Sequence, residues 1–271
     1  MTDDLSWVPP GIDTRRANVA RVYDYWLGGS HNFLADQDAA RATAAVQPSV
    51  RTNARANRAF LRRAVRFLAA NGIRQFLDIG SGIPTEGNVH EIAQRTDPAA
   101  SIVYADVDPV AVAHSRAILA GNPSAAVIEA DLREPQKILA SDTVRDVIDF
   151  ARPVGLLLVA VLHFLTDAED PSQIVATLRD ALAPGSYLAI CHGTSEGTPA
   201  GLRAAEQVYN RSVATNVHVR SRADILRFFD GFDLVDPGLV YIPEWRPDSP
   251  GDVPEDPSKF WGLVGVGRKP S

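Results

Sequence analysis

Three aspartates in the middle of the chain have the residue type and the spacing to hold a small polar ligand. Each stands at the end of a short apolar run, and they are Asp78, Asp106 and Asp131. Such runs are typical of buried strands, and the ligands of parallel sheets bind beyond the carboxyl ends of the strands. We therefore expect three carboxylates along one crevice, where they can accept hydrogen bonds from ammonium, hydroxyl or amino groups.

A glycine turn directly after the first of these strands narrows the class of ligand. Gly80 and Gly82, on either side of Ser81, allow the backbone to turn sharply and to approach a ligand closely. A dinucleotide site requires a third Gly or Ala where this chain has Thr85, and the Asp78 carboxylate would repel a pyrophosphate. The pattern favours a positively charged nucleoside without phosphate, such as S-adenosylmethionine. The alternative is a turn that only joins a strand to a helix.

The other two aspartates suit different parts of such a nucleoside. Asp106 follows Asp78 by 28 residues and can accept hydrogen bonds from both ribose hydroxyls. Asp131 can accept from an adenine amino group, with the backbone amide of Leu132 at the edge of the ring. Asp108 is expected only to cap the next helix, and the same capping role is the alternative for Asp106.

The elements that position these residues alternate between strands and helices. Strands are expected at residues 74–79, 101–105, 126–130, 155–161 and 187–190, and helices at 109–119, at 221–229 and from Asn88 and Asp170. This alternation predicts a doubly wound, parallel α/β sheet with helices on both faces. The runs 234–242 and 260–267 predict an antiparallel pair at the sheet edge, with a turn at Asp236-Pro237-Gly238 inside the first run.

The composition bounds the class of protein. The chain has 271 residues, of which 45% are hydrophobic and 22% charged, so bulk disorder is excluded. No apolar run approaches the ~20 residues of a membrane span, and residues 1–4 lack the basic start of a signal peptide. The formal net charge of -6 disfavours nucleic acid and anionic membranes as partners. A single cysteine, Cys191, and six scattered histidines predict no disulfide and no metal site, and fit a cytoplasmic location.

Together these motifs resemble class I S-adenosylmethionine-dependent methyltransferases. Segments 20–33 and 55–65 are also similar to the actinobacterial S-adenosyl methyltransferase family, formerly a domain of unknown function. The resemblance implies a Rossmann-like sheet of seven strands, mostly parallel with the last strand antiparallel, and S-adenosylmethionine as the cofactor. We expect a helical cover or lid over residues 1–72, packed on a core over residues 73–271.

The resemblance also assigns parts of the cofactor to residues of this chain. It implies that Asp78, Gly80 and Gly82 hold the methionine end. It places the ribose at Asp106 and the adenine at Asp131. Further cofactor contacts are expected from the same loops and from the end of the fourth strand, at Ser81, Val107, Leu132 and Ala160.

The N-terminal segment contains aromatic residues around a pair of glycines. These aromatic residues are Tyr23, Tyr25, Trp26 and Phe33, and the glycines are Gly28 and Gly29. Such a segment suits a lid that closes over a ligand and places aromatic faces near a sulfonium. We include Tyr23 and Asn32 among the expected cofactor contacts. The alternative is an amphipathic helix that packs its aromatic side chains on the sheet and ends at the glycines.

Methyl transfer needs a general base only if the acceptor must lose a proton. His163, just past the fourth strand, is the candidate catalytic base, and the alternative is that it only forms part of the pocket wall. His192 and His31 are weaker candidates. The insertion 201–220 is expected to cover the acceptor, with contacts from Tyr209, Asn210 and Arg211.

The leading hypothesis is methyl transfer to a small-molecule acceptor. No Asn- or Asp-Pro-Pro-aromatic sequence follows the fourth strand, which disfavours amino methylation of nucleic-acid bases. Two alternatives remain open at this point. One is a non-catalytic module that binds S-adenosylmethionine or S-adenosylhomocysteine, and the other, which Thr85 disfavours, is an NAD-dependent oxidoreductase.

Overall fold

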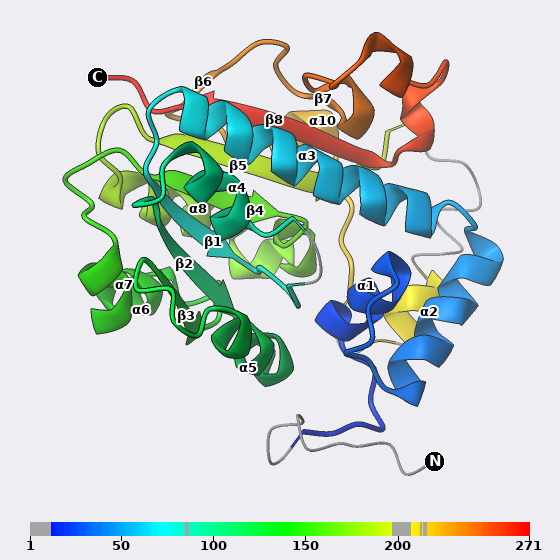
Figure 1. Ribbon diagram of the computed structural model, residues 1–271. Coiled ribbons are helices and arrows are strands. Elements are labelled where there is room, and N and C mark those ends of the chain that lie inside the picture. Colours follow the sequence, from blue (N-terminus) through cyan, green and yellow to red (C-terminus); the bar gives the residue numbers. More distant parts are fainter. Residues whose placement is uncertain (1–11, 85–86, 197–206, 212, 214–215) are drawn as a thin grey trace.

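A central β-sheet organises the protein. The computed structural model describes residues 12–84, 87–196, 207–211, 213 and 216–271. Within these residues the strand order is β3-β2-β1-β4-β5-β8-β6, and β7 also pairs with β8 (Figure 1). The strands are β1 (Gln75–Ile79), β2 (Ser101–Asp106), β3 (Ala125–Glu129), β4 (Gly155–Val159), β5 (Tyr187–Gly193), β6 (Asp233–Leu234), β7 (Val240–Tyr241) and β8 (Gly262–Arg268).

The pairing confirms a mostly parallel sheet whose last strand is antiparallel. Strands β1 to β5 pair in parallel, and β8 runs antiparallel to β5, β6 and β7. The predicted number of seven strands is wrong, because the described residues form eight. The expected strand 234–242 is divided into β6 and β7 by the turn around Pro237 and Gly238, since Pro237 has no N–H for the ladder and Gly238 has a φ of +85°.

The chain direction creates a crevice at one end of the sheet. From β1 the chain moves outward to β2 and β3, and then returns to β4 on the other side of β1. The connections that leave the carboxyl ends of β1 and β4 therefore run to opposite sides, and doubly wound sheets bind ligands in the crevice between such connections. The three aspartates follow or end strands on this edge, as the sequence predicts.

Helices cover both faces of the sheet. Alternate side chains of β1, such as Phe76 and Leu77, enter two different apolar clusters. One face packs against α3 (Val50–Ala70), α4 (Val89–Thr96) and α5 (Pro109–Ile118). The other packs against α6 (Pro135–Ala140), α7 (Asp142–Val147), α8 (Pro171–Ala181) and α10 (Arg222–Arg227). Helices α6 and α7 lie between the third and fourth strands, where the sequence pattern predicts no helix.

Side-chain caps explain where several helices begin. The Asp108 carboxylate accepts from the Val110 amide at 2.8 Å at the start of α5. The Asp170 carboxylate accepts from the Gln173 amide at 3.1 Å at the start of α8. These caps confirm the predicted helix starts and satisfy backbone N–H groups that have no partner within the helix.

The N-terminal residues divide between two packing clusters. Helices α1 (Val19–Leu27) and α2 (Leu34–Val46) lie off the end of the sheet toward which the β1 and β2 arrows point (Figure 1). They share an apolar cluster with Val50 and Ala54 at the start of α3, and with Tyr209 after β5. The remainder of α3 packs on the sheet instead, through Phe60 and Leu68. We call α1 and α2 the cover, because α3 contributes to both clusters.

No helix among the described residues is both long enough and apolar enough to cross a membrane.

Candidate functional site

A cavity of about 280 Å³ lies between the carboxyl ends of the strands and the cover. The turn after β1, the ends of β2 to β5, and helices α1 and α3 all contribute to its wall. Most residues predicted to bind a ligand line this one cavity, and they are Tyr23, Asp78, Gly80, Ser81, Gly82, Asp106, Val107, Asp131, Leu132, Ala160 and His163. The fold thus brings together side chains that are up to 140 positions apart, from Tyr23 to His163.

The turn after β1 has a shape that requires glycine. Gly80 and Gly82 have φ angles of +74° and +67°, which side chains with a Cβ rarely adopt. A Cβ on Gly80 would lie 2.4 Å from Cγ2 of Val161. A Cβ on Gly82 would meet no atom within 4 Å, so its backbone is open to the cavity. Ala160, beside Val161, also has a positive φ of +60°, which places an unfavourable backbone conformation at the cavity wall.

Asp106 connects the first two strand ends. Its Oδ2 accepts from the Gly82 amide at 2.7 Å, and its Oδ1 accepts from the Asp108 amide at 2.9 Å. Burial raises the pKa of Asp106 to about 6, although these two hydrogen bonds lower it. Each carboxylate oxygen can accept a further hydrogen bond from a ligand.

Asp78 is buried and has the more strongly raised pKa. Burial raises it to about 7, the positive charge of Arg58 lowers it, and the neighbouring Asp106 raises it again. Removal of a carboxylate from water disfavours its ionised form, and a bound cation would restore that form. Asp131 differs, because its side chain is 30% exposed and pairs with Arg133 at 3.1 Å.

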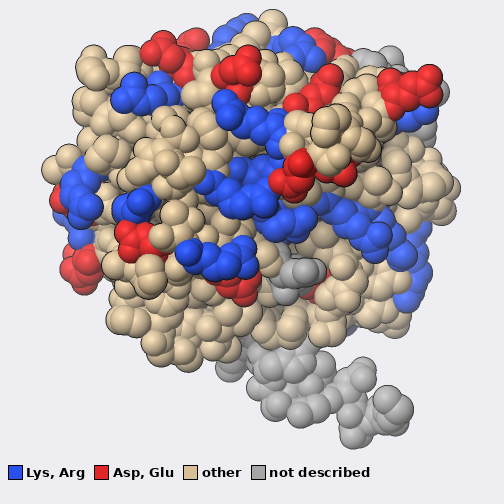
Figure 2. Space-filling model, turned by 45° about the horizontal axis from the view of Figure 1, so that its top comes forward, with Lys and Arg blue, Asp and Glu red and all other residues tan. Residues whose placement is uncertain are grey.

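Arg58 is a member of the site that sequence reasoning missed. It lines the cavity from α3, and its charge acts on the pKa values of Asp78, Tyr23 and Tyr104. Figure 2 shows Lys and Arg side chains as a band across the face that carries α3, a helix with six arginines in its sequence. Because arginine is so frequent on this helix, composition offers no reason to single out Arg58.

His163 and His192 lie side by side but differ in their surroundings. The rings are 5.6 Å apart between centroids, and only His163 lines the cavity. Nδ1 of His163 is buried without a hydrogen-bond partner among the described residues. Burial, with the nearby His192 and Arg220, holds the pKa of His163 well below 6.5. Its imidazole is therefore neutral at pH 7, which is the form that accepts a proton.

The weaker prediction of His192 as a base does not fit the structure. Its Nδ1 lies 2.7 Å from the Gly193 carbonyl oxygen, and its Nε2 lies 3.0 Å from Nη1 of Arg220. The carbonyl requires a proton on Nδ1, and the guanidinium donates to Nε2. Both nitrogens are thus occupied, and burial lowers the pKa of His192 to about 4.

Arg220 is a second residue that sequence reasoning missed. Its buried guanidinium donates to the Leu162 carbonyl at 3.2 Å and to the Leu165 carbonyl at 2.8 Å. It also pairs with the Asp167 carboxylate at 2.7 Å. These bonds hold the loop after β4, which carries His163, against the segment before α10. Arg220 therefore positions the cavity wall without lining the cavity itself.

The aromatic residues of α1 pack on neighbouring helices and line the cavity at the same time. The Tyr23 hydroxyl donates to the Ala54 carbonyl at 3.0 Å and accepts from the Asn57 amide at 2.7 Å. The Trp26 indole N–H donates to the Ala40 carbonyl at 3.2 Å. Both rings nevertheless form part of the wall, so the two sequence interpretations of this segment are compatible.

Asn32 lies outside the cavity wall, which argues against its predicted contact with the cofactor. Its amide nitrogen donates to the Asp24 carboxylate at 2.8 Å and to the Gly29 carbonyl at 3.0 Å. Its carbonyl oxygen accepts from Gln37 at 3.1 Å. All of these partners belong to the cover, so Asn32 stabilises the loop between α1 and α2. The ring of His31 lies against that of His114, with 3.7 Å between the centroids and a tilt of 49°, and His31 is also outside the cavity wall.

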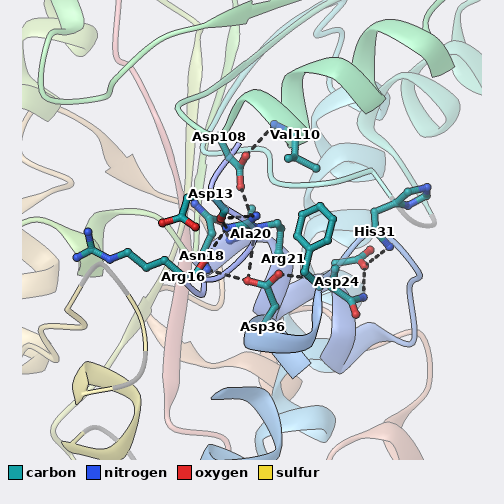
Figure 3. A network of polar contacts seen from close by, with 12 residues as sticks. Asp13, Arg16, Asn18, Ala20, Arg21, Asp24, His31, Asp36, Asp108 and Val110 are labelled. Atoms are coloured by element: carbon teal, nitrogen blue, oxygen red, sulfur yellow. Dashed lines mark hydrogen bonds and ion pairs between the residues drawn. The ribbon is translucent and has the colours of Figure 1, made fainter. Parts of the chain in front are cut away.

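Arg21 ties the cover to the core next to the site. Its guanidinium is buried between the carboxylates of Asp36, at 3.4 Å, and Asp108, at 3.9 Å (Figure 3). Asp36 also accepts from the Asn18 amide at 2.8 Å. Asp108 is thus more than the predicted helix cap, because it also faces a cation from the cover.

The insertion after β5 contributes one of its three predicted residues to the cavity. Tyr209 is buried and lines the wall. Asn210 instead accepts from the Val217 amide at 2.8 Å, and Arg211 is exposed. Residues 201–206, 212 and 214–215 of this insertion lie outside the described residues, as does Thr85 in the glycine turn. In the described part of the chain, no group of three or more His, Cys, Asp or Glu side chains could hold a metal ion.

Known proteins share both the sequence pattern and the fold. A profile described as S-adenosyl methyltransferase matches residues 6–270. A candidate methyltransferase from Thermobifida fusca YX is 42% identical over 98% of this chain and 99% of its own, with a TM-score of 0.92. A DUF574 family protein from Streptomyces avermitilis MA-4680 is 39% identical over 95% of this chain and 99% of its own, with a TM-score of 0.91.

More distant likeness is confined to the fold. An O-methyltransferase family protein from Burkholderia thailandensis is 15% identical over 92% of this chain and 64% of its own, with a TM-score of 0.54. No protein with a curated description matches the chain.

The glycine turn generates a prediction with a matched control. Gly80→Ala and Gly121→Ala both place a Cβ at positive φ, but only the first creates a contact, with Val161, whereas Gly121 has no atom within 4 Å. We expect Gly121→Ala to lower the free energy of unfolding by about 1–2 kcal/mol from the backbone alone. Gly80→Ala should cost about 1–3 kcal/mol more because of overpacking. Urea denaturation measures both, and equal losses would contradict the close packing of Gly80 on Val161.

Proposed function

The chain belongs to the S-adenosyl methyltransferase family and is an S-adenosylmethionine-dependent methyltransferase, and we propose that it methylates a small-molecule acceptor bound in the cavity beyond the sheet. The observation that carries this proposal is the distribution of charge in that cavity. Carboxylates from β1, β2 and β3 line one part of it, whereas apolar and aromatic side chains line the remainder. Family membership also removes the NAD-dependent oxidoreductase alternative.

The carboxylate part of the cavity fits the cofactor. We assign the ammonium group of the methionine end to Asp78 and its carboxylate to Arg58, because the two side chains face the cavity with opposite charges. Gly82 leaves its backbone open to the cavity, and Ser81 Oγ is buried without a hydrogen-bond partner among the described residues. Both features fit a polar ligand placed close to the turn.

The nucleoside part of the cofactor fits the next two strand ends. The Asp106 oxygens each retain capacity for a ribose hydroxyl after accepting their backbone N–H groups. We assign the adenine to Leu132 and Asp131, with Val107 and Ala160 as neighbouring wall residues. Because the Asp131 side chain is partly exposed, at 30%, we assign the adenine amino group to the mouth of the site.

The catalytic contribution of the protein is alignment, exclusion of water and removal of one proton. Bound S-adenosylmethionine supplies a methyl group that its sulfonium has already activated. We propose that His163 accepts the proton of the acceptor, because its imidazole is neutral and lines the cavity. Arg220 positions His163 through the carbonyls on either side of it, at Leu162 and Leu165.

Calorimetry tests the assignment of Asp106. We expect the wild-type protein to bind S-adenosylmethionine and S-adenosylhomocysteine. Asp106→Ala should weaken both by about 10- to 100-fold, since hydrogen bonds to a charged group contribute about 1.5–3 kcal/mol. Asp233→Ala, at an exposed position of β6, is the control and should leave the dissociation constants unchanged. Equal affinity of wild type and Asp106→Ala, or no binding to either, would refute the proposed cofactor site.

The raised pKa of Asp78 predicts how cofactor binding depends on pH. A group with a pKa of about 7 is half protonated at neutral pH, and the cofactor's ammonium selects the ionised form. Affinity should therefore fall as the pH drops from about 8 to about 6, and binding at pH 7 should release about half a proton. Calorimetry in buffers of different ionisation enthalpy measures that proton. Affinity that stays constant or rises on acidification would contradict this role, and Asp78→Asn should remove the pH dependence and weaken binding.

Replacement of His163 tests the proposed base. His163→Gln should lower the turnover number by about 100- to 10,000-fold and leave the dissociation constant of S-adenosylmethionine unchanged. The neutral imidazole is active, so wild-type turnover should be insensitive to pH above 6.5 and fall only below the depressed pKa of His163. Formation of S-adenosylhomocysteine with an acceptor from a metabolite extract measures turnover. Unchanged turnover in His163→Gln would assign this residue to the pocket wall, and binding without turnover on any acceptor would favour the non-catalytic module.

A further inference from the structure

We propose that the methyl acceptor is an uncharged, planar molecule that carries a hydroxyl group. It would occupy the acceptor half, the part of the cavity whose wall includes Trp26, Phe164, Cys191, Tyr209, Val217 and Trp261. This inference rests on the proposed function, because that function assigns the carboxylate half of the cavity to S-adenosylmethionine.

The acceptor half, among its described residues, lacks charged side chains. The acidic residues among the described wall residues are Asp78, Asp106, Asp108 and Asp131, and all lie at or just after the carboxyl ends of the first three strands. Among the described residues of the acceptor half there is no Asp, Glu, Lys or Arg. The two arginines among the described wall residues are associated with these acids, because the charge of Arg58 acts on Asp78 and Arg133 pairs with Asp131 at 3.1 Å.

The titratable groups of the acceptor half are also held uncharged. Burial raises the pKa of the Cys191 thiol to about 12 and raises that of the Tyr209 hydroxyl, while it lowers the pKa of His163. An anionic or cationic acceptor would thus lose its hydration without gaining a counter-charge. An uncharged acceptor avoids the free-energy cost of this desolvation.

Aromatic side chains form much of the wall of the acceptor half. The rings of Trp26 and Tyr209 lie 5.9 Å apart between centroids, although they come from α1 and from the segment after β5. The ring of Phe164 lies 4.4 Å from that of His163. Aromatic faces of this kind pack favourably on a planar molecule, whose edges and faces complement their quadrupoles.

The cavity wall also contains residues with uncharged polar atoms. Nε1 of Trp261 and the side-chain oxygens of Asn53 and Asn57 are buried without a hydrogen-bond partner among the described residues. An unpaired buried polar group is unfavourable, and a neutral donor or acceptor on the ligand can offset that cost. A hydroxyl group provides both functions without a charge.

The chemistry of methyl transfer selects the hydroxyl group among nucleophiles. An aliphatic amine arrives at neutral pH as a cation and a carboxylate arrives as an anion, so neither fits an uncharged wall. A hydroxyl oxygen forms the new bond to the methyl carbon while the carbon–sulfur bond breaks and its electron pair goes to sulfur. The hydroxyl proton passes to His163 and then to water, so the products are a methyl ether and S-adenosylhomocysteine.

A matched set of three probes tests the proposal. Naphthol, naphthoate and naphthylmethylamine share a planar ring and differ in charge at pH 7. We measure their binding by calorimetry to the protein saturated with S-adenosylhomocysteine, and methyl ether formation from naphthol with S-adenosylmethionine. We expect naphthol to bind at least tenfold more tightly than either charged probe. Equal or tighter binding of naphthoate or of the amine, or no binding of naphthol, would overturn the proposal.

Two variants locate the binding in the acceptor half. Val217→Lys introduces a counter-charge into this wall and should shift the preference at least tenfold toward naphthoate. Leu226→Lys, at an exposed position on α10, adds the same charge elsewhere and should leave the preference unchanged. An identical response of both variants would contradict binding at this wall.

The binding of S-adenosylhomocysteine and the preference for naphthol distinguish a failure of the proposed function from a failure of the proposal about the acceptor. If the wild-type protein did not bind S-adenosylhomocysteine, the proposed function would be refuted. Intact binding of S-adenosylhomocysteine without a preference for naphthol would refute only the inference about the acceptor.

Discussion

The Asp106 carboxylate is the constraint on which the site depends. It is buried at the end of β2, where its desolvation is costly, and it accepts from the amides of Gly82 and Asp108. One side chain thereby fixes the glycine turn after β1 and the start of α5. Because Asp78 is buried beside it, the end of the sheet contains two carboxylates with raised pKa values. Such a place stabilises a bound cation more strongly than a neutral or anionic ligand.

The remainder of the cavity is assembled from elements that side chains tie to this sheet end. Arg21 joins the cover to Asp108, and the Tyr23 hydroxyl joins α1 to the backbone of α3. On the opposite side, Arg220 joins the loop of His163 to the segment before α10. These contacts bring aromatic rings from distant parts of the sequence to one apolar wall. The charged and uncharged halves of the cavity are then suited to two different ligands, a cationic cofactor and a neutral acceptor.

Much of the fold could be predicted, because it depends on local patterns. Short apolar runs identify β1 to β5, and capping residues such as Asp108 and Asp170 mark the starts of helices. The failures also have local causes. Pro237 and Gly238 interrupt the predicted strand 234–242, which changes the number of strands from seven to eight. The division at residue 72 stays a prediction, and packing rather than local pattern bears on it, since α3 contributes to the clusters of both the cover and the sheet.

By itself the sequence determined the strand ends and the residues that follow them, since these depend on neighbours along the chain. It therefore grouped Asp78, Asp106 and the glycines between them, and the structure places all four in the wall of one cavity. Only the tertiary structure decided which residues lie opposite these strand ends in the cavity, because contacts across the cavity join residues far apart in the chain. It brought Arg58 toward Asp78 and left Asn32 outside the cavity, within the hydrogen bonds of the cover. Burial and long-range contacts, which no local pattern encodes, also set the charge state of each group.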